Sequence, residues 1–250
     1  MSLNNFLKKY FLFAFLIISF QSAFANEFEE KSTTLKDIFN KKSSTIAIGN
    51  LKLGQTGVVV HKYSDDLQII VSNAKVVISD ENFSVIEFFK FEDLKQDAIA
   101  TTKKEPQVGD EFILNFMYKN SLLIAPNFES FNQITKDFSS HRFIHPDIFA
   151  AKLKYENSLY PTKKEIQDFA IEQNLGTIFF LVENSLYIVD SKTFSILKKI
   201  NFETNKELEK KLPFFTRVED IRESLINFNI TNWFKEKESY DSHYKKILGL

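Results

Sequence analysis

The chain of 250 residues contains no cysteine, and this absence limits how the fold can be held together. Disulfides, thiolate metal sites and cysteine nucleophiles are all excluded. The protein must therefore be stabilised by a packed hydrophobic core. Its 44% hydrophobic and 26% charged residues are an ordinary composition for a globular chain. Its length suits one large domain or two small ones.

The first 25 residues have the pattern of a secretory signal peptide. Lys8 and Lys9 supply positive charge, and the uncharged run Tyr10–Phe20 is apolar. We expect cleavage between Ala25 and Asn26. The apolar run has eleven residues, too few for the roughly 20 that span a membrane. The sequence thus predicts export to the periplasm or outer cell surface, with no integral membrane segment after processing.

The processed chain is expected to be close to neutral. It keeps 30 basic and 33 acidic residues, a net charge of −3, so no basic surface for nucleic acid is expected. We find no cofactor or metal motif and no catalytic pattern such as a nucleophile elbow. These absences favour a non-enzymatic protein without cofactors.

The chain divides into segments of different periodicity. Residues 26–44 are polar with a weak helical spacing, and we interpret them as a lead-in or short helix. Residues 45–126 contain β-branched stretches separated by Asp, Asn and Ser turns, which predict consecutive hairpins and a β-rich domain. We expect this domain to be an antiparallel barrel or sandwich.

Residues 127–250 alternate helical and strand patterns and predict an α/β domain. Pro146 is typical of a helix start, and Thr162 begins a capping box. Apolar stripes over 218–228 and 233–247 predict two further helices. The aromatic residues of the second stripe either dock that helix on the core or bind a partner. The fold class predicted overall is α+β, a barrel-like or sandwich-like half followed by an α/β half.

Two patterns resemble ligand motifs. Gly49–Thr56 has the spacing of a phosphate loop, but Gln55 replaces the lysine that contacts phosphate, so we interpret it as a loop between strands. His141 and His145 are four residues apart, but Pro146 disfavours a helix there, and on a strand they would lie roughly 13 Å apart. We expect His145 at a helix entry and His141 on the surface.

An enzyme on the α/β half is a further hypothesis. It requires Arg217, His145 and Asp147 to converge on one pocket in the folded protein. Structural pairing of the arginines with carboxylates is the simpler interpretation.

Asn82 lies in the sequence Asp80-Glu81-Asn82-Phe83-Ser84, which resembles the extended acceptor of bacterial periplasmic N-glycosylation. It falls on a predicted hairpin turn, where an acceptor is exposed. Asn82 is therefore a candidate glycosylation site, and an ordinary turn is the alternative.

Several motifs, in order along residues 45–250, are similar to one family. It is the N-terminal domain family of bacterial plasminogen-binding surface proteins of the PgbA type. The motifs are Gly54–His61, Gly109–Phe116, Leu122–Asn127, Phe143–Leu153, Leu212–Val218 and Tyr240–Gly249. The resemblance implies an envelope or surface protein that recruits host plasminogen.

The resemblance also implies a mechanism through exposed lysines, because kringle modules recognise an ammonium beside a carboxylate over aromatic rings. This chain ends in Leu250 rather than in the terminal lysine ascribed to the family, so the candidates are internal. The pairs considered are Lys163 or Lys164 with Glu165, and Lys235 with Glu238. The full set of candidate partner-binding residues is Lys163, Lys164, Lys235, Lys245 and Lys246. The alternative function is a periplasmic structural or assembly component with no host partner.

Overall fold

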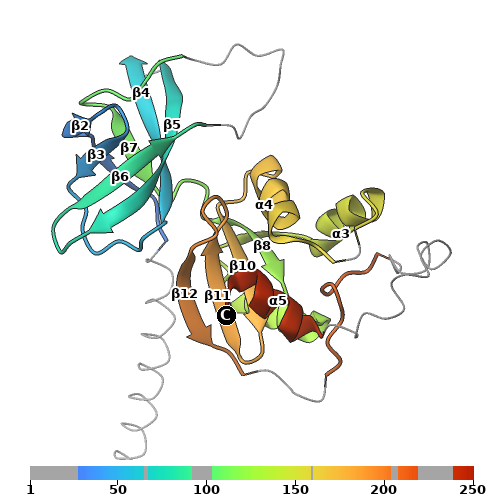
Figure 1. Ribbon diagram of the computed structural model, residues 1–250. Helices are drawn as coiled ribbons and strands as arrows, with labels where there is room; N and C mark the ends of the chain where they lie inside the picture. The colour runs from blue at the N-terminus through green and yellow to red at the C-terminus, as the bar shows by residue number, and fades with distance from the viewer. Residues whose placement is uncertain (1–27, 65–66, 92–102, 159, 204–207, 219–238) are drawn as a thin grey trace, which may run out of the picture.

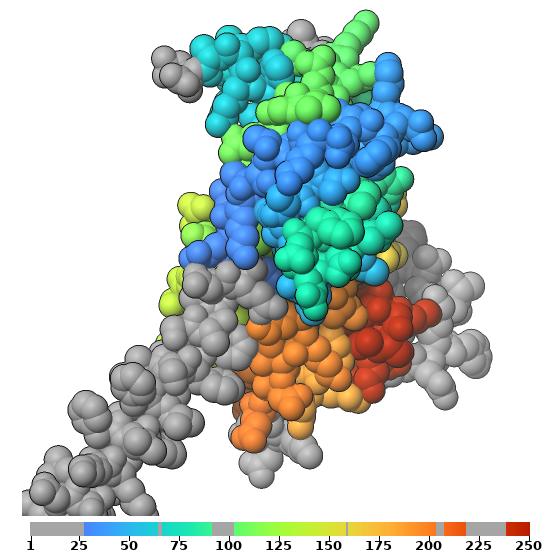
Figure 2. Space-filling model, turned by 90° about the vertical axis from the view of Figure 1, so that its left-hand side faces the viewer, coloured from blue at the N-terminus to red at the C-terminus, as the bar shows by residue number. Residues whose placement is uncertain are grey.

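The computed structural model describes residues 28–64, 67–91, 103–158, 160–203, 208–218 and 239–250. It contains two β-sheets that lie side by side, with helices gathered around the second (Figure 1). Figure 2 shows the first sheet stacked over β11–β12 of the second. This arrangement confirms the α+β class with a β-rich N-terminal half.

The first sheet is antiparallel throughout and has seven strands. In spatial order they are β1 (Lys31–Thr34), β7 (Glu111–Leu114), β4 (Thr56–Ser64), β5 (Leu67–Ser79), β6 (Ser84–Phe89), β3 (Ser43–Ile46) and β2 (Asp37–Phe39). The sheet curls, because its two edge strands β1 and β2 are joined only by Leu35 and Lys36. Its interior side chains form one core that includes Val59, Ile86 and Phe112.

A short helix, one of the two interpretations of residues 26–44, is wrong. This segment forms β1, β2 and the start of β3. Leu35, which suggested a helical stripe, is instead buried as the link between the two edge strands. Most residues of β1 and β2 are exposed, so their sequence lacks the apolar alternation that marks a half-buried strand.

The second sheet has five strands, in the order β12 (Ile196–Asn201), β11 (Ser185–Asp190), β10 (Thr177–Val182), β8 (Asn120–Ile124) and β9 (Arg142–Ile144). β10, β8 and β9 are parallel, and β10, β11 and β12 are antiparallel. Residues 120–124 were expected in the β-rich half, but β8 pairs with β10 and β9 of this sheet. The four residues Ser121–Ile124 are buried, which suits a central strand covered on both faces.

Helices cover both faces of the second sheet. α3 (Pro146–Tyr155), α4 (Lys163–Glu172) and α5 (Tyr240–Leu248) pack on one face, visible together in Figure 1. α2 (Phe128–Asp137) packs on the other. Alternate residues of β10 serve the two faces, since Phe180 joins the first core and Phe179 the second.

The predicted helix starts are confirmed. Pro146 occupies the first turn of α3, and the Thr162–Glu165 capping box begins α4. Tyr240 and Tyr244 are buried, so this part of the C-terminal aromatic stripe docks on the core. The expected helix over 218–228 and the Trp233 end of the stripe lie outside the described residues, apart from Val218, which packs against that core.

The two sheets are joined by hydrogen bonds to one buried carboxylate. Asp190, at the end of β11, accepts a bond from the Thr56 hydroxyl (2.6 Å) at the start of β4. Its other oxygen accepts the backbone N–H groups of Lys192 and Thr193. The Tyr118 hydroxyl also donates to Asp190 and accepts the Thr56 N–H (2.8 Å). Burial raises the pKa of both Asp190 and Tyr118, and these bonds replace the lost hydration.

The loop Gly49–Thr56 forms the rest of this junction between the sheets. Gln55 is buried and donates to the Asn115 side chain (2.6 Å). Gly54 has φ +81° and a Cβ there would lie 2.0 Å from the Ser195 hydroxyl oxygen. Its carbonyl accepts the Thr193 hydroxyl at 2.7 Å. The glycine therefore allows close approach of the two sheets, and the segment is the interstrand loop that was expected.

Replacing Asp190 with alanine should destabilise the whole protein. The change leaves the buried hydroxyls of Thr56 and Tyr118 without this acceptor, at a cost of about 1–3 kcal/mol for each buried donor. We expect the free energy of unfolding in urea to fall by about 4 kcal/mol. Asp137→Ala, an exposed position on α2, is the control and should change it by less than about 0.5 kcal/mol. Equal midpoints for the two variants would contradict this role.

Candidate functional site

Two of the candidate lysines lie at the start of α4. The Lys163 ammonium sits 4.7 Å from the centre of the Phe194 ring. The Lys164 ammonium pairs with Asp168 one turn later, which raises the pKa of Lys164. Glu165, considered above as a partner for Lys163 or Lys164, instead accepts the N–H and hydroxyl of Thr162 in the capping box.

Two more candidates lie in the last turn of α5. Lys245 pairs with Glu183 in the β10–β11 turn, and this carboxylate raises the pKa of Lys245. Lys246 is exposed and has no partner within the described residues. Lys235, the fifth candidate, and Glu238 lie outside the described residues. α4 and α5 pack on the same face of the second sheet, so the four described lysines belong to one helical layer.

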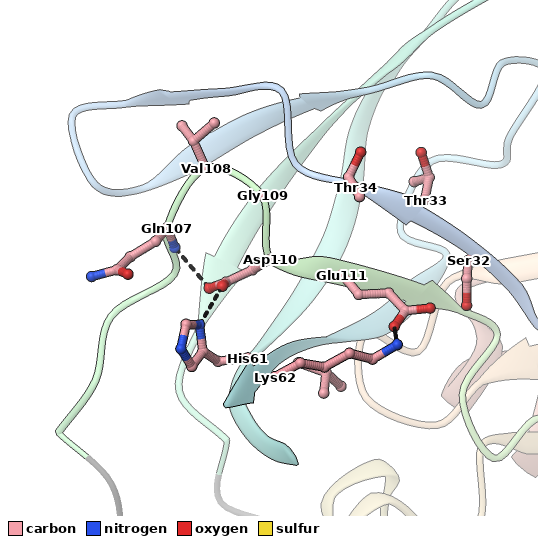
Figure 3. Close-up of a pocket in the computed structure, with 11 residues that line it drawn as sticks. Ser32, Thr33, Thr34, His61, Lys62, Gln107, Val108, Gly109, Asp110 and Glu111 are labelled. Atoms are coloured by element: carbon pink, nitrogen blue, oxygen red, sulfur yellow. Dashed lines mark hydrogen bonds and ion pairs between the residues drawn. The ribbon is translucent and has the colours of Figure 1, made fainter. Parts of the chain in front are cut away.

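A polar hollow of about 530 Å³ lies at one end of the first sheet. Its walls come from β1, β4 and the turn that leads into β7, as Figure 3 shows. His61 and Asp110 point toward each other in its wall, with Nδ1 and Oδ1 2.6 Å apart. Lys62 and Glu111 form an ion pair beside them (2.6 Å).

The His61–Asp110 pair resembles the histidine and aspartate of a catalytic triad, but its contacts link β4 to the turn before β7. With a neutral ring, Nδ1–H donates to Asp110 and Nε2 accepts from the Lys104 ammonium at 2.8 Å. The nitrogen that would act as a base is therefore engaged. The second Asp110 oxygen accepts the Gln107 N–H (2.8 Å), so the cluster fixes the turn before β7. Sequence analysis missed this cluster, because His61 and Asp110 are 49 residues apart.

The three residues required by the enzyme hypothesis do converge. Asp147 accepts the Arg217 Nε–H at 2.8 Å and lies 3.3 Å from the His145 Nδ1. It also accepts the Thr216 hydroxyl and the Arg217 backbone N–H, both at 2.8 Å. His145 is the N-cap residue of α3, as expected from Pro146.

The contacts of Asp147 identify its role as a structural anchor. Burial opposes ionisation, but the bonds from Arg217 and Thr216 prevail and lower the pKa of Asp147 to about 2. The carboxylate holds residues 216–217 against the start of α3. This matches the simpler interpretation of Arg217 as a structurally paired arginine.

His141 is not the surface residue that was expected. Its ring packs edge-on against Phe179, with centroids 5.0 Å apart, and its Nδ1 lies 3.0 Å from the Ser121 hydroxyl. Burial lowers the pKa of His141 to about 4. The two histidines thus serve separate structural contacts. Within the described residues no group of three or more His, Asp or Glu side chains is placed to hold a metal ion.

Asn82 is exposed in the turn between β5 and β6. Ser84, the hydroxyl residue of the acceptor motif, is fully buried at the start of β6. Its hydroxyl donates to the Ile48 carbonyl (2.7 Å) and lies 2.9 Å from the Ser79 hydroxyl. The two halves of the motif therefore differ in accessibility once the sheet has formed.

The clusters around Asp110 and Asp147 hold loops in place, and Lys163, Lys164 and Lys246 are exposed to solvent. None of the described helices is long and apolar enough to cross a membrane. The chain belongs to the plasminogen-binding protein pgbA N-terminal family, whose model matches residues 32–248. This confirms the resemblance found from the sequence motifs.

Two relatives carry the name plasminogen-binding protein PgbA and come from the J99 and 26695 strains of Helicobacter pylori. Each is 29% identical over 204 residues, covering 82% of this chain and 44% of the relative. The chain therefore spans less than half the length of these curated relatives. No solved structure matches it.

Replacing His141 should change how the free energy of unfolding depends on pH. The folded-state pKa of about 4 lies below the ordinary 6.5, so the unfolded chain binds a proton that the folded chain does not. This contribution to stability is present above pH 6.5 and is lost as the pH falls toward 4. His141→Gln should remove about 2 kcal/mol of the stability difference between pH 7 and pH 4.5 in urea unfolding. An unchanged difference in the variant would contradict the burial of a neutral ring.

Proposed function

We propose that this protein is exported and binds plasminogen without catalysing a reaction. The observation that carries the proposal is the family match over residues 32–248, because it includes nearly all the described elements. The similar Helicobacter pylori proteins are named for plasminogen binding. The engagement of His61 and Asp147 in structural bonds also favours binding over acid–base chemistry.

We propose that binding uses exposed lysines on the α4 and α5 layer. An ammonium that already pairs with a carboxylate must leave it to enter a partner's site, and exposed pairs of this kind are weak. Lys164 and Lys245 are in such pairs, whereas Lys246 has no described partner. Lys246 is therefore the lysine that binding would engage at the least cost.

Export is supported by the pattern of the first 25 residues. Lys8 and Lys9 precede the uncharged apolar run Tyr10–Phe20, and the segment ends in small residues at Ala25. We propose that cleavage falls between Ala25 and Asn26.

Plasminogen capture tests the lysine mechanism. The mature protein, immobilised, should capture plasminogen, and excess 6-aminohexanoate should abolish capture because its ammonium competes with the lysine side chain for the same site on plasminogen. Lys246→Gln should weaken binding about tenfold, which corresponds to about 1.4 kcal/mol.

Lys136→Gln is the matched control, since Lys136 is also an exposed lysine in the last turn of a helix, on the opposite face of the sheet. Capture that ignores the lysine analogue would rule out the lysine mechanism. Equal loss in the two variants would show that Lys246 has no special part.

The mass of the native protein tests processing and modification. We expect an N-terminus at Asn26 and recovery outside the cytosol. A glycan on Asn82 is expected where the source cell has a transferase, attached before β6 buries Ser84. A chain beginning at Met1 would contradict export, and a bare Asn82 beside an active transferase would contradict the modification. Protection from protease in intact cells would favour the alternative, a periplasmic structural component.

A further inference from the structure

The parallel part of the second sheet contains a topological switch point. The chain leaves β8 through α2 on one face and leaves β9 through α3 on the other, although the two strands are neighbours. In open α/β sheets, the crevice beyond the carboxyl ends of such strands is where ligands bind. In this protein the crevice lies beyond Ile124 and Ile144.

Part of this crevice is occupied by the protein's own chain. Residues 211–217 cross the end of β8, where the Lys211 and Phe215 N–H groups donate to the Pro126 and Ala125 carbonyls, both at 2.8 Å. Asp147 fixes the far end of this segment through Thr216 and Arg217. The segment therefore lines the crevice as a second wall opposite α2.

A hollow of about 380 Å³ remains between this segment and the start of α2. One side is aromatic, since the Phe128 and Phe215 rings lie 5.4 Å apart and tilted by 56°. Phe128 is 54% exposed, which is unusual for a phenylalanine beside a core. Among the described residues, the hollow thus offers an apolar surface that other side chains leave partly exposed.

The remaining wall of the hollow carries positive charge. Lys210 pairs with Asp241, but the Lys211 ammonium donates only to the Thr216 carbonyl among the described contacts (3.1 Å). No described carboxylate forms an ion pair with Lys211, while Glu209, which also lines the hollow, is exposed to water. The site therefore combines two phenyl rings with one ammonium that has no described carboxylate partner.

We propose that this hollow binds a small carboxylate that carries an aromatic or apolar group. The ring of the ligand packs on Phe128 and Phe215, and its carboxylate meets the Lys211 ammonium. The volume suits a ligand of roughly ten to fifteen heavy atoms. This site is on the second sheet but separate from Lys246, so it does not depend on plasminogen binding.

Phenylacetate is the first probe, titrated into the isotope-labelled mature chain and followed by NMR. We expect saturable shifts with a Kd of about 1 mM, as suits ten heavy atoms in an open site. Acetate, which lacks the ring, and benzylamine, which reverses the charge, should both bind at least tenfold more weakly.

Phe128→Ala and Lys211→Gln should each weaken phenylacetate binding at least fivefold while the rest of the spectrum is preserved. Phe83→Ala, an exposed phenylalanine in the β5–β6 turn, and Lys136→Gln are the matched controls and should bind normally. Absence of saturation, or equal binding of benzylamine, would overturn the proposal. Unaltered binding by Phe128→Ala would also overturn it, and this variant changes no hydrogen bond that holds the segment.

Discussion

The structure depends on one buried carboxylate that accepts hydrogen bonds from both sheets. Asp190 terminates β11, yet its donors include Thr56 of the first sheet and Tyr118 of the connection between the sheets. A charge in this position would be costly without such donors, and with them it fixes the position of the two sheets relative to each other. Gly54 and Gln55 surround the same point, so the contact between sheets is polar and specific.

The three surface features described above lie on different parts of the two sheets. The polar hollow with His61 belongs to the first sheet, whereas the lysines of α4 and α5 lie on helices of the second. The switch-point hollow is formed by the second sheet together with residues 209–215. The first of these surface features belongs to the first sheet and the other two to the second, and the Asp190 network links the two sheets.

Local sequence signals predicted local structure well. Pro146 and the Thr162–Glu165 box determine helix starts through bonds within a few residues, so they can be recognised without the fold. β8 could not be assigned to its sheet from the sequence, because a strand buried on both faces has the same continuous apolar pattern in either of the two sheets. The Thr56–Asp190 bond joins residues 134 apart, which no spacing rule captures.

In the candidate site, too, the sequence predicted which residues matter locally, and only the fold shows how they are paired. Sequence reasoning named Arg217, His145 and Asp147, and the fold brings them together, but their bonding as an anchor follows only from the path of residues 211–217. The candidate lysines could be listed from the sequence. Their pairing could not, because Lys245 meets Glu183 across 62 residues. Whether the ammonium of a candidate lysine is paired with a carboxylate can therefore depend on a residue far away in the sequence.

The position of Asp190 in the chain has a consequence for the order of folding. During synthesis from the N-terminus, all seven strands of the first sheet are complete by Leu114, and its antiparallel neighbours can pair at once. The hydroxyls of Thr56 and Tyr118 cannot donate to the Asp190 carboxylate until that residue, 72 positions after Tyr118, has been synthesised. The bonds that join the two halves therefore require β11 to be present, whereas the first sheet can pair all its own strands without it.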